Sequence, residues 1–149
     1  MANATVHASA VLAGARAVLI RGPSGSGKSR LAFALISAAA SGAFPFARLV
    51  GDDRVHVEVA HGRVLVRPAE ALQGLIEIRG LGIRRLPFEP VAQVGLVVDL
   101  AAADATRLPQ GASAVTDVGG VTLPRLAVAP GMDPGPAVFA ALRTEDSGL

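Results

Sequence analysis

The chain has 149 residues, which is enough for one domain of ordinary size and too few for two. Hydrophobic residues make up 51% of the chain and charged residues 17%, so it can bury a packed core and is not a disordered polymer. Lys and Arg (14) nearly balance Asp and Glu (12), and aromatic residues are only 3%. A nucleic-acid partner is therefore disfavoured, because it needs a basic surface or stacking rings.

The sequence contains no cysteine, which excludes disulfides, a thiolate zinc site and a cysteine nucleophile. Its longest largely apolar stretch, residues 31–40, is much shorter than the roughly 18 residues that a membrane span requires. The first residues also lack the basic region and apolar run of a signal peptide. We therefore expect a cytoplasmic protein with no membrane partner.

The first predicted elements are a strand and a helix on either side of a glycine-rich loop. Residues 17–20 are a short apolar run that ends at Gly22 and predicts a buried strand. Residues 30–41 are rich in Ala and Leu and predict a helix that ends before Gly42 and Pro45.

The later elements are mostly short strands. Residues 55–59 and 63–66 alternate around a turn at His61 and Gly62, which predicts a hairpin. The remaining predictions are strands at 75–79, 94–100, 121–123 and 126–128, loops at 68–73, 84–90 and 101–114, and a closing helix at 136–143. Because strands and helices do not alternate regularly, we expect one α/β domain over residues 1–149 with a mixed, partly antiparallel sheet.

The glycine-rich loop fits the pattern G-x-x-x-x-G-K-[ST] at every fixed position. Glycines let backbone N–H groups approach phosphate oxygens, and the start of the next helix presents its own unpaired N–H groups. Lys28, the only lysine of the chain, can reach the β and γ phosphates, and the Ser29 hydroxyl can bind Mg²⁺. The predicted nucleotide-binding residues are Gly22, Pro23, Ser24, Gly25, Ser26, Gly27, Lys28 and Ser29.

A phosphate-binding loop does not by itself identify the reaction. A switch GTPase is excluded, because its base-reading N/T-K-x-D element would need a second lysine. The chain is also too short for a large motor ATPase. A protein kinase, a small-molecule kinase of the shikimate or gluconate type, and a non-catalytic ATP-binding sensor remain as alternatives.

Two carboxylate positions are candidates for the chemistry. Asp52 and Asp53 are adjacent, and they repel each other unless one meets a cation or holds a proton. One can accept the proton of an attacking hydroxyl while the other binds the metal, or both can lie in a solvated turn. Glu77 is flanked by Ile76 and Ile78, so it is either a second Mg²⁺ ligand or an outward-facing strand residue.

Together these motifs resemble the catalytic domain of the HPr kinase/phosphorylase family, bacterial enzymes that phosphorylate a serine of the phosphocarrier protein HPr. The matching features, in order, are His7, the phosphate-binding loop, the segment Asp52-Asp53-Arg54-Val55, and the octapeptide Ile-Glu-Ile-Arg-Gly-Leu-Gly-Ile at residues 76–83. The octapeptide is the most specific of them. The chain is most similar to the short, single-domain form found in alphaproteobacteria, without a separate N-terminal domain.

The resemblance implies a P-loop domain similar to the phosphoenolpyruvate carboxykinase-like fold, which uses ATP and Mg²⁺ to phosphorylate HPr. It also implies the reverse reaction, in which inorganic phosphate attacks phosphoserine and releases pyrophosphate. By the same resemblance we expect a homo-oligomer, specifically a hexamer.

The resemblance also implies roles for individual residues. Asp52 would take the proton of the serine hydroxyl and return it in the reverse direction, with Asp53 supporting it. Ser29 and Glu77 would hold Mg²⁺. His7 would lie near the phosphates, the alternative being a structural histidine. Arg107 would match a loop arginine that meets the phosphates or HPr, the alternative being a surface arginine.

Overall fold

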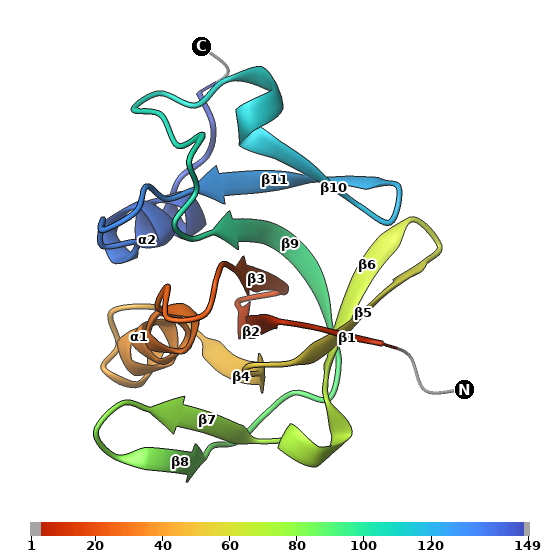
Figure 1. Ribbon diagram of the computed structural model, residues 1–149, viewed down its shortest axis with the longest axis vertical. Helices are drawn as coiled ribbons and strands as arrows, with labels where there is room; N and C mark the ends of the chain where they lie inside the picture. The colour runs from red at the N-terminus through yellow and green to blue at the C-terminus, as the bar shows by residue number, and fades with distance from the viewer. Residues whose placement is uncertain (1–3, 148–149) are drawn as a thin grey trace.

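The structure of the chain is a computed structural model that describes residues 4–147. Its strands form a nine-stranded sheet and a separate two-stranded hairpin (Figure 1). The sheet has the order β1-β5-β6-β9-β3-β2-β4, with β11 beside β9 and β10 beside β11. Its strands are β1 (Thr5–Val6), β2 (Ala8–Ala13), β3 (Arg16–Arg21), β4 (Ala47–Gly51), β5 (Val55–Ala60), β6 (Arg63–Pro68), β9 (Ala92–Asp99), β10 (Val115–Val118) and β11 (Val121–Ala127).

The hairpin and the helices complete the described fold. The hairpin pairs β7 (Leu75–Ile78) with β8 (Gly82–Arg85), and the α-helices are α1 (Lys28–Ala40) and α2 (Gly135–Arg143). Short 3₁₀ turns lie at Glu70–Leu72 and Gly111–Ala114. Within residues 4–147, no helix is long and apolar enough to cross a membrane.

The sheet is mixed, as predicted. Strand β9 runs parallel to both β3 and β11, whereas β2 runs antiparallel to β3 and to β4. The carboxyl ends of β3, β9 and β11 therefore lie at the same edge, while β2 and β4 approach β3 from its other side. The predicted α/β fold with a mixed, partly antiparallel sheet is confirmed.

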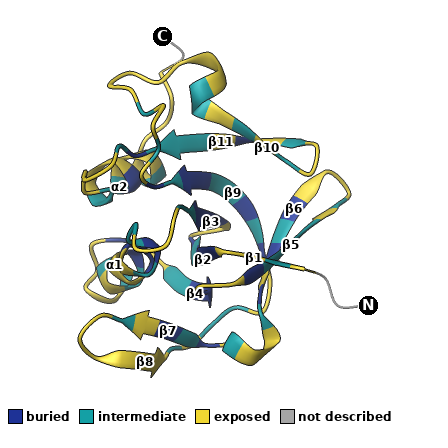
Figure 2. Cartoon of the chain, in the orientation of Figure 1, coloured by how far each residue is buried: buried dark blue, intermediate teal, exposed yellow. Residues whose placement is uncertain are grey.

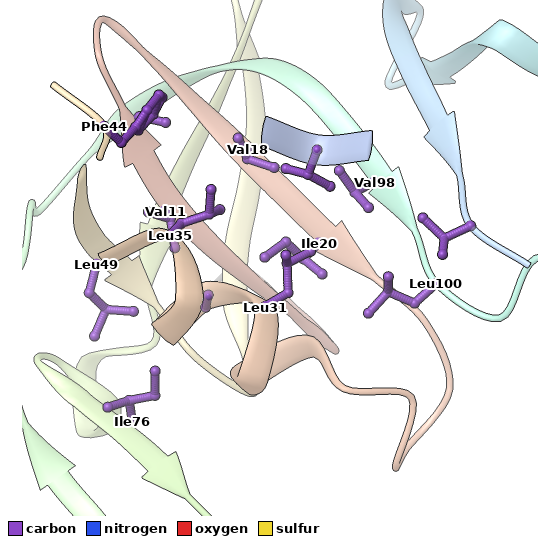
Figure 3. Packing of buried hydrophobic residues seen from close by; sticks show 14 residues of the cluster. Val11, Val18, Ile20, Leu31, Leu35, Phe44, Leu49, Ile76, Val98 and Leu100 are labelled. Atoms are coloured by element: carbon purple, nitrogen blue, oxygen red, sulfur yellow. The ribbon is translucent and has the colours of Figure 1, made fainter. Parts of the chain in front are cut away.

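Strand β3 is buried on both faces, which explains its continuous apolar sequence (Figure 2). Because side chains alternate along a strand, Val18 and Ile20 point to one face and Ala17 and Leu19 to the other. The first face packs against the helices in a cluster that includes Val11, Leu31, Leu35, Leu49, Ile76, Val98, Leu100 and Val138 (Figure 3). The second face packs against residues of β4, β5 and β6, among them Val50, Val55, Val64 and Val66.

Most predicted elements are present, with three differences. Strands β1, β2, β4 and β10 were not predicted, because β1 has two residues, β2 contains small residues such as Ala8 and Ser9, and β4 and β10 lie next to polar loops. The predicted loop at 84–90 is wrong at its start, because Arg84 and Arg85 belong to β8. The two short strands predicted around Pro124 are one strand, β11.

Pro124 is tolerated inside β11 because of where it lies in the sheet. It is opposite Val115 of β10, and the parallel pairing with β9 begins only at Arg125. That half of β11 therefore has the character of an edge strand, where a proline does not interrupt a second ladder.

An ion-pair network joins the ends of β3, β9 and β11. Asp99 accepts hydrogen bonds from Arg21 (2.7 and 2.8 Å) and from Arg125 (2.6 Å), and Arg125 also reaches Asp104 at 2.7 and 2.9 Å. Burial would raise the pKa of the Asp99 carboxyl, but the two guanidinium groups outweigh it and lower that pKa below its ordinary value. Because Arg21 directly precedes Gly22, this network fixes the strand end from which the glycine-rich loop begins.

Replacing Asp99 with Asn should lower the free energy of unfolding by about 1–3 kcal/mol at pH 7, because the two arginines lose a charged acceptor. The Asp99 pKa is lowered in the folded state, so its contribution is present above the unfolded pKa of about 3.9 and is lost as the pH falls through the folded value. Urea unfolding at pH 7 and pH 3 should therefore show a smaller difference between wild type and Asp99→Asn at pH 3. Glu58→Gln, in the exposed pair with Arg67, is the control and should change stability by less than about 0.5 kcal/mol. An equal loss at both pH values would contradict this role for Asp99.

Candidate active site

Residues 22–29, the candidate phosphate loop, follow β3 directly and include the first two residues of α1, Lys28 and Ser29, so the predicted strand–loop–helix order is present. Gly25 and Gly27 have φ angles of 80° and 99°, a region that side-chain-bearing residues rarely adopt. The Gly27 carbonyl accepts the first helical hydrogen bond, from the Leu31 N–H at 3.0 Å. The helix therefore begins within the loop, and its first N–H groups are available to an anion.

Gly22 allows the loop to pass close to the end of β9. A Cβ atom at Gly22 would lie 2.6 Å from the Ser26 Oγ and 3.0 Å from the Leu100 Cβ. The Ser26 hydroxyl is itself buried and has no hydrogen-bond partner. A buried hydroxyl without a partner is costly in a folded protein, and a bound ligand that pairs with it removes that cost.

Backbone carbonyls of the loop fix the side chain of Lys28. Its side chain is buried, and its Nζ donates to the carbonyls of Gly22 (2.8 Å) and Pro23 (3.0 Å). These contacts place the ammonium group of the only lysine in the sequence beside the backbone amides of the same loop. The arrangement concentrates positive charge where a polyphosphate would bind.

Asp52 is the most buried acidic residue at this site, at 4% exposure. It accepts hydrogen bonds from the Ser9 hydroxyl (2.6 Å), from the Ser29 hydroxyl (2.7 and 2.9 Å) and from the Glu77 backbone N–H (3.2 Å). These donors belong to β2, α1 and β7. The carboxylate therefore joins three elements and fixes the Ser29 hydroxyl, but it does not line the cleft in front of the loop.

Asp53, unlike Asp52, lines the cleft in front of the loop. Its φ of 69° turns the chain between β4 and β5, so the two adjacent carboxylates do not share one side. The Asp53 Oδ1 lies 2.8 Å from the His7 Nε2, and the side chains of Asp53 and His7 are 62% and 43% exposed. Both residues line a cleft of about 680 Å³ together with the loop and Glu77.

The structure brings most of the predicted site residues together. One cleft is lined by His7, Asp53, Glu77 and residues 24–29. Asp52 does not line it but accepts a hydrogen bond from Ser29. The carbonyls of Gly22 and Pro23 accept hydrogen bonds from Lys28. Arg107 is different: it lies exposed in the loop after β9 and does not line the cleft. Ser9 was missed, because a serine in an unpredicted strand carries no recognisable signal.

Ser29 and Glu77 line this end of the cleft, and the Asp52 carboxylate lies next to the Ser29 hydroxyl. Within the described residues, no group of three or more His, Asp or Glu side chains is arranged to hold a metal ion by itself. Mg²⁺ suits such an incomplete oxygen set, because proteins usually bind it through one or two carboxylates with substrate phosphates as the other ligands. The donor set therefore fits Mg²⁺ bound together with a polyphosphate.

Comparison with known proteins identifies the family. The model of the HPr serine kinase C-terminal domain matches residues 1–105, so the chain belongs to this family. Among solved structures, the HPr(Ser) kinase/phosphatase from Coxiella burnetii superposes with a TM-score of 0.75 at 22% identity, covering 95% of this chain and 89% of that one. This likeness confirms the fold. Among curated proteins, none matches the chain in sequence.

The hydrogen bond from Ser9 to Asp52 should matter for stability. Ser9→Ala removes a buried donor to a carboxylate, so we expect the free energy of unfolding to fall by about 1.5–3 kcal/mol in urea titrations. The control is Ser41→Ala, since the exposed Ser41 hydroxyl bonds only to the Ala38 carbonyl and its loss should cost no more than about 0.5 kcal/mol. Equal stability of the two variants would contradict the role given to Ser9.

Proposed function

We propose that this member of the HPr serine kinase C-terminal domain family transfers the γ-phosphoryl group of ATP to a serine hydroxyl of the phosphocarrier protein HPr. The observation that carries the proposal is the position of Asp53, which is paired with His7 and lines the same cleft as Lys28 and the candidate phosphate loop. A carboxylate and a phosphate site in one open cleft are what a hydroxyl acceptor requires.

In this proposal the loop binds the triphosphate. Backbone N–H groups of the loop and the positive end of α1 face the phosphate oxygens. Lys28 exchanges its bonds to the Gly22 and Pro23 carbonyls for bonds to phosphate, and the Ser26 hydroxyl gains the partner that it lacks within the protein. These contacts hold the γ phosphorus in line for attack and offset the charge that develops during transfer.

Ser29, Asp52 and Glu77 would hold Mg²⁺ in this proposal. The donors to Asp52 are neutral, two hydroxyls and an amide, so its hydrogen bonds orient the carboxylate without cancelling its charge. A cation at this point is therefore favourable for a carboxylate that is largely removed from water. Bound Mg²⁺ would neutralise charge on the phosphate oxygens.

The general base in this proposal is Asp53, whereas the family resemblance had suggested Asp52. Asp52 is buried and already accepts hydrogen bonds from Ser9, Ser29 and Glu77, so a serine of another protein has no route to it. Asp53 is exposed in the cleft and is oriented by His7. As the serine oxygen bonds to the γ phosphorus and the bond to ADP breaks, Asp53 accepts the hydroxyl proton.

The same groups can run the reaction with inorganic phosphate. Phosphate attacks the phosphorus of phosphoserine, the bond to the serine oxygen breaks, and Asp53 returns its proton to that oxygen. The products are serine and pyrophosphate. No further residue is required, because the loop that binds the β and γ phosphates of ATP also binds pyrophosphate.

Purified chain incubated with ATP, Mg²⁺ and HPr should produce phosphoserine on HPr, and phosphorylated HPr with inorganic phosphate should release pyrophosphate. Lys28→Ala should abolish both reactions, because the loop loses its ammonium group, whereas Arg63→Ala on the exposed start of β6 should retain them. Mass spectrometry of HPr and a pyrophosphate assay measure the two directions. ATP binding without transfer would favour a sensor, and transfer only to a metabolite would favour a small-molecule kinase.

Substitutions of Asp52 and Asp53 should have different effects on ATP binding and on phosphoryl transfer. Asp53→Asn should retain ATP affinity and lower the transfer rate by a factor on the order of 10² or more, because the base is lost. Asp52→Asn should instead weaken binding of ATP in the presence of Mg²⁺ more than in its absence. Calorimetric titrations with and without Mg²⁺, beside single-turnover rates, distinguish the roles. Unimpaired transfer by Asp53→Asn would remove Asp53 from the role of base.

A further inference from the structure

The β7–β8 hairpin exposes apolar side chains at a free strand edge (Figure 2). Strand β8 pairs only with β7 among the described strands, and all four of its residues are exposed. Ile83 of this strand is 63% exposed, and Leu81 in the turn before it is 61% exposed. A hydrogen bond from the Leu81 N–H to the Ile78 carbonyl, at 2.9 Å, closes that turn. Two neighbouring aliphatic side chains are therefore presented to water on an ordered hairpin, as on a surface that binds a partner.

The same hairpin carries an excess of positive charge. It contains three arginines, Arg79, Arg84 and Arg85, and a single acidic residue, Glu77. Within residues 4–147, none of the three arginines takes part in an ion pair, whereas other surface arginines are paired with carboxylates. The chain as a whole has a net charge of only +2, so this local excess favours a partner surface that is acidic.

The strand register places the exposed side chains beside the candidate active site. Ile83 is paired with Glu77, so the two side chains lie on the same face of the hairpin. Glu77 and Arg79 both line the cleft of about 680 Å³ that contains Asp53. A partner that covers Ile83 therefore lies at the mouth of the cleft that the acceptor serine has to enter.

The α1 side of the cleft has a similar character. Arg30 and Phe33 of α1 line the cleft opposite Ile78 and Arg79 of the hairpin. Arg30 lies in the first turn of α1, which contains no acidic residue, and there the positive end of the helix dipole disfavours a further cation. Both sides of this part of the cleft therefore offer a guanidinium group and an apolar side chain to whatever enters it.

We propose that the β7–β8 hairpin is the docking surface for the acceptor protein, which would present an apolar patch with acidic residues at its rim beside the target serine; this inference rests on the proposed function. Leu81 and Ile83 form the centre of the interface, and Arg79 and Arg85 contact acidic groups around it. Buried apolar side chains at the centre of an interface supply most of the affinity, whereas charges at the rim steer association.

A second copy of the chain is the other candidate occupant, and charge and access both disfavour it. In a two-fold symmetric contact the same surface meets itself, so two arginine-rich hairpins would repel each other. A copy seated on Ile83 would also restrict the path of an acceptor to Asp53.

Steady-state phosphorylation of HPr by the purified chain at saturating ATP tests the apolar centre. Ile83→Ser should raise the KM for HPr about tenfold, because an apolar contact is lost, and should leave kcat and the KM for ATP within about twofold of wild type. The matched control is Val115→Ser, since Val115 is also an exposed apolar residue of an edge strand, at 42%, but lies on β10. It should leave all three constants at wild-type values.

The charged rim should show in the salt dependence. Arg85→Glu should raise the KM for HPr about fivefold at low salt and by less at high salt, because salt screens exposed charges. Arg63→Glu, at the exposed start of β6, is the matched control and should change neither the KM nor its salt dependence.

The remaining outcomes separate this inference from the proposed function. An unchanged KM for HPr in both hairpin variants would overturn the docking surface while the proposed function stands. If the wild-type chain does not phosphorylate HPr, the proposed function fails and the docking surface with it. Sedimentation velocity should give the same particle size for wild type and Ile83→Ser; a smaller particle for the variant would assign the hairpin to a contact between copies and overturn the proposal.

Photocrosslinking gives a second measurement that does not depend on turnover. The photoreactive amino acid p-benzoylphenylalanine in place of Leu81 should cross-link the chain to HPr, and in place of Val115 it should not. Cross-links from position 81 to another copy of the chain, with none to HPr, would overturn the proposal.

Discussion

The buried carboxylate of Asp52 is the constraint on which the site depends. It accepts hydrogen bonds from Ser9 on β2, from Ser29 at the start of α1 and from the Glu77 backbone on β7. An ionised group removed from water is tolerated only when its lone pairs are satisfied, so these three elements must meet at one point. The position of the candidate phosphate loop relative to the acidic side of the cleft follows from that requirement.

The two flanks of the loop differ because the strands on either side of β3 run in different directions. On one flank, β2 and β4 bring Ser9 and the Asp52–Asp53 turn to the loop. On the other flank, the parallel strands β9 and β11 end beside a hollow that residues of the loop and of the segments after both strands line. The acidic residues and the histidine of the candidate site therefore lie on one flank of the loop.

Much of the fold and most residues of the candidate site could be predicted from the sequence, but the different positions of Asp52 and Asp53 could not. The glycine-rich loop depends on local spacing, so its strand–loop–helix context was predicted correctly, as were the β5–β6 hairpin, β9 and α2. The division between Asp52 and Asp53 could not be predicted, because it depends on a left-handed backbone conformation at Asp53 and on the depth of the turn. Ser9 and β2 were missed since small residues give no periodic signal.

The position of the β7–β8 hairpin also depends on Asp52, through the hydrogen bond from the Glu77 backbone. The β7–β8 pair is separate from the main sheet, and an isolated two-stranded hairpin is only marginally stable in water. It is held by Ile76, which is fully buried in the helix-side cluster, by the Leu86 N–H on the Gly74 carbonyl at 2.8 Å, and by the bond from Glu77 to Asp52. The Glu77 side chain therefore faces the loop only while the hairpin stays bound to the Asp52 carboxylate. One buried charge thus sets the positions of a hydroxyl, a second carboxylate and the helix end that they face.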